Sequence, residues 1–109
     1  MKKLFVIIAI LFSYVSGSTY SEGFKLYKEA KKELRKGHIE KSKALFLEAK
    51  LKFEDGKKKN SSQSIAKLAE LYCNGWGVEK DPIKAKLYLN KAKELGLSFV
   101  SDKCLKNLK

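Results

Sequence analysis

The chain has 109 residues, enough for one small domain and too few for a multidomain enzyme with a large enclosed active site. Its 24 lysines and arginines outnumber 12 aspartates and glutamates, which gives a formal net charge of +12, and 44% of the residues are hydrophobic. This hydrophobic fraction excludes wholesale disorder. One histidine and two distant cysteines do not supply a four-ligand zinc site. We expect neither a bound metal nor a cofactor.

The first eighteen residues have the order of a secretory signal peptide. Lys2 and Lys3 form a positive start, residues 4–12 are unbroken apolar residues, and residues 13–18 are mostly small. A transmembrane anchor would need about 20 apolar residues, roughly twice this run. The sequence therefore predicts a signal peptide at residues 1–18, and a mature protein that is periplasmic or secreted and has no membrane span.

The predicted export determines the redox state expected for the two cysteines. Export would place Cys73 and Cys104 in an oxidising compartment, where only one pairing is available to them. A disulfide between them would close a loop of about 30 residues and stabilise the fold by roughly 3–4 kcal/mol. The alternative is a pair of free thiols packed as small hydrophobic side chains.

Apolar residues recur at helical spacing from Tyr20 onward. They follow steps of three and four residues as far as Leu34, and Gly37 is expected to end this first helix. A second amphipathic helix is predicted to begin near Ile39 and to end at Gly56. Residues 57–62 are the most polar stretch of the chain and are predicted to form a linker.

Start and stop signals define a second pair of helices. Ser61 or Ser62 can cap the third helix, which residues 75–77 (Gly-Trp-Gly) should interrupt. Asp81 and Pro82 are an N-cap carboxylate followed by proline at the first helical position, and they predict the start of the fourth helix.

These signals predict an all-α fold in one domain, residues 20–109. Its parts are a helical hairpin at 21–56, a second hairpin at 61–96 and a closing helix at 98–108. No segment shows sustained alternation of apolar and polar residues, so we expect no strands. A lone hairpin cannot bury its own apolar face, so the two hairpins should stack as a short α-solenoid.

The two hairpins also share a residue pattern that indicates an internal repeat. Small, large, large and small residues recur at an offset of 43 positions: Ser42, Leu45, Phe46 and Ala49, then Ala85, Tyr88, Leu89 and Ala92. Small residues would let neighbouring helices approach closely, and the large residues would fill the space between them.

Residues 66–96 resemble one repeat of the Sel-one-like repeat family, which is related to the tetratricopeptide repeat. The residues that carry the family pattern are Leu68, Ala69, Tyr72, Gly75, Gly77, Asp81, Ala85, Tyr88, Ala92 and Gly96. Residues 21–56 resemble a tetratricopeptide hairpin more loosely. Some exported bacterial relatives are cysteine-rich, but Lys93 occupies the position where their repeat cysteine usually lies. A bridge from Cys73 to Cys104 would instead tie the closing helix to the second hairpin.

The resemblance implies a non-catalytic module that binds a protein or peptide on the concave face of the repeat stack. By analogy, the candidate contact residues are Lys31 and Arg35 on the first hairpin and Glu70 and Asn74 on the second. Trp76 either covers the end of the hairpin or serves as an exposed anchor for the partner. Two repeats are fewer than the usual three, so a disulfide or a partner chain, identical or different, would supply the missing stability.

An enzymatic alternative rests on Ser64 and Lys67, which spell the S-x-x-K arrangement of serine β-lactamases and penicillin-binding proteins. The Lys-Thr-Gly and Ser-Asp-Asn motifs that accompany it in those enzymes are absent from the sequence. His38 is better interpreted as a hairpin-turn residue than as a catalytic base.

A basic module that binds anionic surfaces is the remaining alternative, because the net charge would support non-specific attraction. All but one of the 24 basic residues are lysines, and they are spread along every predicted helix. Arg35 alone offers the bidentate geometry used for bases and phosphates, so no specific nucleic-acid recognition is predicted.

Overall fold

A computed structural model of the chain describes residues 19–98 and 103–106, so the predicted signal peptide at 1–18 lies outside the described residues. The described part contains helices and no strand, which confirms the all-α prediction. The helices are α2 (Thr19–Arg35), α3 (Ile39–Lys58), α4 (Ser62–Asn74), α5 (Pro82–Glu94) and α6 (Lys103–Lys106). In these described ranges, no helix combines the length and the apolar character needed to cross a membrane.

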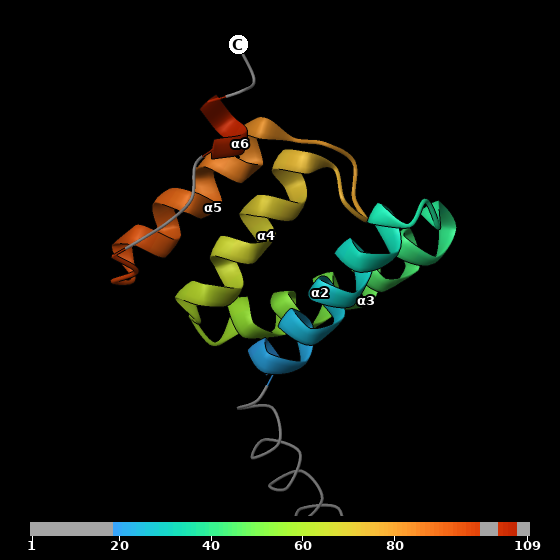
Figure 1. Cartoon of the computed structure of the whole chain (residues 1–109). Helices are drawn as coiled ribbons and strands as arrows, with labels where there is room; N and C mark the ends of the chain where they lie inside the picture. Colours follow the sequence, from blue (N-terminus) through green and yellow to red (C-terminus); the bar gives the residue numbers. More distant parts are fainter. Residues whose placement is uncertain (1–18, 99–102, 107–109) are drawn as a thin grey trace, which may run out of the picture.

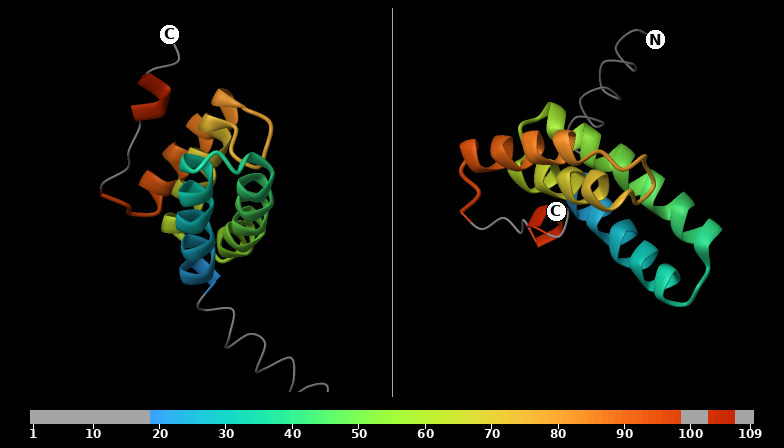
Figure 2. Two further views of the ribbon diagram at one scale, coloured as in Figure 1. Left: turned by 45° about the vertical axis from the view of Figure 1, so that its right-hand side comes forward. Right: turned by 90° about the horizontal axis from the view of Figure 1, so that it is seen from above.

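The helices form two hairpins that share one interface. α2 packs along α3 and α4 packs along α5, while α3 also contacts α4 and thereby joins the hairpins (Figures 1 and 2). The short helix α6 lies against α4. The predicted solenoid of stacked helical hairpins is therefore confirmed.

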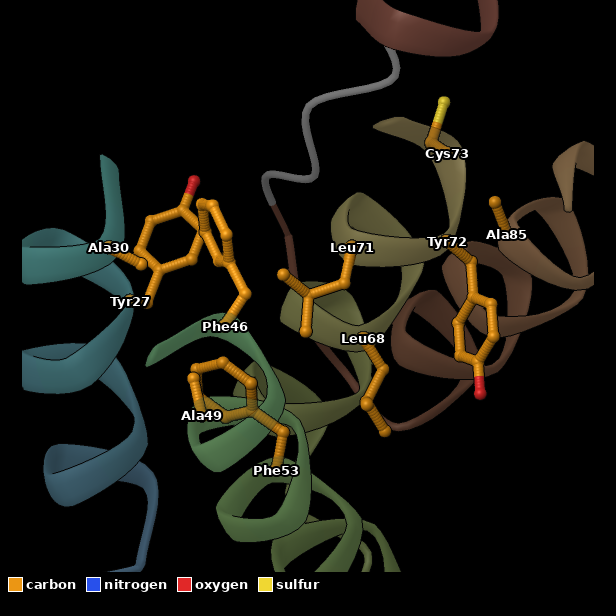
Figure 3. Close-up of a cluster of buried hydrophobic side chains, with 10 residues drawn as sticks. All are labelled: Tyr27, Ala30, Phe46, Ala49, Phe53, Leu68, Leu71, Tyr72, Cys73 and Ala85. Atoms are coloured by element: carbon orange, nitrogen blue, oxygen red, sulfur yellow. The ribbon is translucent and has the colours of Figure 1, made fainter. Parts of the chain in front are cut away.

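The buried residues reproduce the repeat pattern of the sequence. Ser42, Phe46 and Ala49 on α3 are each at most 1% exposed, and Ala85, Leu89 and Ala92 occupy the equivalent buried positions on α5. Aromatic and aliphatic side chains from α2, α3 and α4 fill the space between the helices, as Figure 3 shows. The small residues let helices approach closely, and Ser42 Oγ donates a hydrogen bond of 3.0 Å to the carbonyl of Ala30 on α2.

The structure confirms the predicted N-cap residues of α4 and α5. Ser61 Oγ accepts a hydrogen bond of 3.3 Å from the Ser64 backbone N–H, and Asp81 Oδ1 accepts one of 3.1 Å from Lys84. In the connection between α4 and α5, Gly75 and Gly77 have φ values of 71° and 72°. Because these values lie in the left-handed region, this turn requires residues such as glycine.

Gly56 does not end the second helix, contrary to the prediction. α3 continues through Gly56 to Lys58, and the chain turns at Asn60, whose φ is 59°. Gly56 is buried where α3 meets α4, and a Cβ atom added there would lie 2.6 Å from Ser64 Cβ. The glycine is explained by the close approach of the two helices rather than by helix termination.

The prediction that the closing helix at 98–108 begins at Ser98 is also wrong, because Ser98 is not helical. The Leu97 backbone N–H donates to the carbonyl of Ala92 at 3.1 Å, and Gly96 has a φ of 100°. These two features close α5 and redirect the chain. Residues 99–102 and 107–109 lie outside the described part, and the described helix is α6 alone.

Glu33 holds the turn between α2 and α3. Its nearly buried carboxylate lies 2.7 Å from His38 Nδ1 and 3.7 Å from both Lys36 Nζ and Lys41 Nζ. The hydrogen bond from His38, followed by the charges of Lys41 and Lys36, lowers the pKa of Glu33 below its ordinary value. His38 therefore has a clear structural role as a turn residue.

We predict that Gly56→Ala destabilises the protein by about 1–3 kcal/mol, because the added methyl group overpacks the contact between α3 and α4. Urea unfolding followed by circular dichroism at 222 nm measures the change. The matched control is the same substitution in a Ser64→Gly background, where the opposing side chain is gone and the loss should shrink by at least half. An equal loss in both backgrounds would contradict this origin of the effect.

Candidate functional site

The first helices of the two hairpins line a shared hollow of about 460 Å³ on one side of the molecule. Both helices are labelled in Figure 1. The lining residues are Phe24, Tyr27, Lys28, Lys31 and Arg35 from α2, with Lys67 and Glu70 from α4. We call this hollow the α2–α4 groove. Three of its residues, Lys31, Arg35 and Glu70, are candidates that the sequence placed on the concave face.

A hydrogen bond between Tyr27 and Glu70 ties the two walls of the groove together. The Tyr27 hydroxyl donates to the Glu70 carboxylate, 2.7 Å from Oε2 and also in contact with Oε1. Tyr27 is only 3% exposed, and Figure 3 shows its ring beside that of Phe46. Burial, and then the carboxylate of Glu70, raise the pKa of Tyr27 far above its ordinary value of 10.0. The hydroxyl therefore stays protonated and remains a donor throughout the physiological range.

Lysine ammonium groups lie over the aromatic rings of the groove. Lys67 Nζ is 4.4 Å from the centroid of the Tyr27 ring and 5.3 Å from that of Phe24. Lys28 Nζ lies 4.9 Å from the Phe24 centroid, and Lys31 Nζ lies 5.3 Å from that of Tyr27. These distances are in the range of cation–π contacts. The groove thus has aromatic rings at its centre and positive charges around them.

Trp76 belongs to the core next to the groove rather than to the groove lining. Its ring stacks on Phe46 with centroids 5.1 Å apart and planes 11° apart, and it lies 6.3 Å from the Tyr27 ring. The indole is half-buried, so the structure favours the packing interpretation of Trp76 over the exposed anchor. Lys31 Nζ reaches to 5.7 Å from the Trp76 centroid and connects this residue to the groove.

Asn74 is exposed but does not line the groove. Its Nδ2 donates to the carbonyl of Glu70 one turn earlier at 2.9 Å, so the side chain is used at the end of its own helix. Four further residues of the groove were not predicted as contact residues from the sequence: Phe24, Tyr27, Lys28 and Lys67. A usable signal was present, because Lys28 precedes Lys31 and Arg35 at the spacing of one helix face.

The enzymatic alternative does not fit the geometry. Ser64 is completely buried at the contact with Gly56, and its Oγ makes no hydrogen bond within the described part of the chain. Lys67 Nζ, which would have to activate it, lies over Tyr27 and 3.7 Å from Glu70 Oε1. A serine nucleophile must be accessible both to the substrate and to the base that activates it. Ser64 is accessible to neither. Residues 19–98 and 103–106 also contain no cluster of three metal-ligating side chains.

Two other hollows lie beside the connection between α4 and α5, and both have mixed charge. One, of about 490 Å³, contains Lys50 and Lys80 together with Glu79 and Asp81. The other, of about 380 Å³, is lined by apolar residues with one lysine, Lys43, and one glutamate, Glu40. Neither has the positive excess of the α2–α4 groove.

A second set of lysine–tyrosine contacts has a structural role. Lys57 Nζ on α3 donates to Tyr88 Oη on α5 at 3.2 Å and lies 3.1 Å from Glu54. The hydrogen bonds to Tyr88 and Glu54 raise the pKa of Lys57 above its ordinary value. This ammonium group is occupied within the protein and connects α3 to α5.

We predict that Tyr27→Phe destabilises the protein by about 1–2 kcal/mol near pH 7, because it removes the hydrogen bond to a charged acceptor across the groove. Since folding raises the pKa of Tyr27, this contribution is complete below about pH 10 and is lost as the pH rises above it. Urea unfolding of both proteins at pH 8 and at pH 11 tests this expectation. The stability difference should narrow at pH 11, and a difference that stays constant would contradict the assignment.

Comparison with known proteins agrees with the geometry of the second hairpin. Residues 62–97 match the family model of the Sel1 repeat, a span that contains the whole of α4 and α5. No curated protein and no solved structure matches the chain. The resemblance predicted from residues 66–96 is confirmed, while kinship with the cysteine-rich exported relatives stays a prediction. The hairpin of α4 and α5 therefore matches the Sel1 repeat.

Proposed function

We propose that this protein is a non-catalytic interaction module that binds a protein or peptide partner in the α2–α4 groove. Sel1 repeats generally mediate protein–protein interaction. The observation that carries the proposal is the groove itself, which draws its walls from the first helix of each hairpin and combines aromatic rings with charged side chains. Aromatic residues and arginine are the residue types that contribute most at protein interfaces.

The groove is preformed, which favours binding. Tyr27 and Glu70 fix the distance between α2 and α4, and the core side chains beneath them are buried. A partner would therefore have little of the protein to order when it binds, and less of the interaction free energy would be lost to entropy.

We also propose that the protein acts after export, as a periplasmic or secreted domain held together by a disulfide between Cys73 and Cys104. Two observations support the disulfide. Helix α6, which contains Cys104, lies against α4, and the described part of the chain contains no free cysteine. Cys73 is 3% exposed near the end of α4, and its sulfur points away from the aromatic side chains (Figure 3).

We predict that reduction lowers the free energy of unfolding by about 2–4 kcal/mol, because the unfolded chain regains the conformations that the closed loop excludes. Urea unfolding with and without dithiothreitol measures this effect. Cys104→Ser is the matched control and should be insensitive to the reductant. Alkylation of both thiols in the denatured but unreduced protein would contradict the disulfide.

The binding proposal predicts position-specific crosslinking. A photoreactive benzoylphenylalanine in place of Lys28, in the groove, should crosslink a defined partner in extracts of the native source. The same group in place of Leu87, a residue of α5 that is 62% exposed, should not. The purified partner should then protect the groove position in a titration. Crosslinking at Leu87 alone, or at both positions equally, would contradict binding in the groove.

A further inference from the structure

Three cations of the groove are left without a carboxylate partner in the described part of the chain. They are Lys28, Lys31 and Arg35, and all three lie on α2. Six of the described acidic residues engage nearby lysines. Glu33 pairs with Lys36 and Lys41, Glu22 with Lys52, Glu40 with Lys43, Glu54 with Lys57 and Asp55 with Lys59, while Glu70 pairs with Lys67 inside the groove. The α2 wall of the groove is therefore a row of positive charge that the protein's own described side chains do not neutralise.

The spacing of these cations defines what could neutralise them. Lys28, Lys31 and Arg35 follow each other at steps of three and four residues, so they share a face of α2 and span about 10 Å of its axis. An extended peptide advances about 3.3 Å per residue and covers that length with about three to four residues. Two or more acidic side chains within such a short segment would meet the whole row.

The opposite wall has a different character. Glu70 already accepts from Tyr27 and pairs with Lys67, and its carboxylate side chain remains 29% exposed. It would repel acidic side chains of a ligand and so direct them toward α2. The half-buried ring of Phe24 on α2 lines the groove and would contact an apolar side chain next to the acidic ones.

From this arrangement we propose that the α2–α4 groove recognises an acidic peptide segment, one with at least two carboxylates and an adjacent apolar side chain. This inference rests on the proposed function, since it assigns the chemistry of the partner that the groove binds. Lys28, Lys31 and Arg35 bind the carboxylates, and Phe24 contacts the apolar side chain.

The test begins with selection from a displayed library of random dodecapeptides on the immobilised full chain. We expect the selected peptides to be enriched in aspartate and glutamate beside an aromatic or aliphatic residue. Enrichment without acidic residues would overturn the acidic specificity and leave the interaction module intact. A selection that enriches no peptide would overturn the proposed function as well.

A synthetic copy of the selected peptide then measures the role of the cations. Trp76 is the only tryptophan of the chain and lies beside Lys31, so its fluorescence can report binding. The double variant Lys31→Gln/Arg35→Gln should weaken binding about 2- to 30-fold at physiological ionic strength, since it removes two ionic contacts with the ligand. Replacing the acidic residues of the peptide by their amides should have a similar effect.

The matched control is Lys25→Gln/Lys32→Gln, which removes the same charge from exposed positions of α2 that do not line the groove. It should change the affinity by less than about 2-fold at physiological ionic strength. Equal losses in both double variants would overturn the proposal in favour of general attraction between opposite charges. The same conclusion would follow if duplex DNA or phosphatidylglycerol vesicles compete as strongly as the acidic peptide.

Discussion

The close approach of α3 to α4 at Gly56 and Ser64 determines how the two hairpins fit together. The position of Gly56 leaves no space for a Cβ atom, because Ser64 packs directly against its backbone. α3 is thereby in contact with both α2 and α4, and the hairpins join through it. Since α3 supplies most of this interface, the outer parts of α2 and α4 remain free to form the walls of a groove. The unpaired hydroxyl of Ser64 is the local cost of that contact.

The two walls are also related by the internal repeat. Tyr27 and Glu70 are 43 residues apart, the same offset that relates the buried residues of α3 and α5. At this offset the two hairpins carry complementary groups, because the first supplies a buried hydroxyl donor and the second supplies a carboxylate acceptor. Phe24 and Lys67 have the same relation and form a cation–π contact. The two hairpins are therefore joined by direct contacts between residues that lie 43 positions apart.

Most of the fold could be predicted from sequence, because the residues that start and end helices agreed with the helical spacing of the apolar residues. Asp81 and Pro82 marked a helix start that the structure places at the same residues. Gly56 was misleading because a glycine inside a helix and one that ends it look alike until the neighbouring helix is known. Ser98 was assigned to a helix on apolar spacing alone, although the closing bond from Leu97 to Ala92 redirects the chain there.

The groove was only partly predictable for a related reason. Lys31, Arg35 and Glu70 could be assigned by analogy with other stacks of helical hairpins, and all three line the groove. The role of Tyr27 could not, because an aromatic residue at a core spacing gives no sign that its hydroxyl reaches the neighbouring repeat. Asn74 was predicted to be a contact residue but does not line the groove, since its side-chain amide donates to a backbone carbonyl within its own helix.

A positive charge spread over the whole surface would attract many anionic partners and discriminate poorly among them. The aromatic surface of the groove changes this balance, because Phe24 adds an apolar contact with the ligand that depends on shape and that salt does not screen. The lysines and Arg35 would then accelerate encounter and orient the ligand, while the ring of Phe24 would set how long it stays. Specificity in so basic a domain therefore depends on the few positions where charge and aromatic surface occur together.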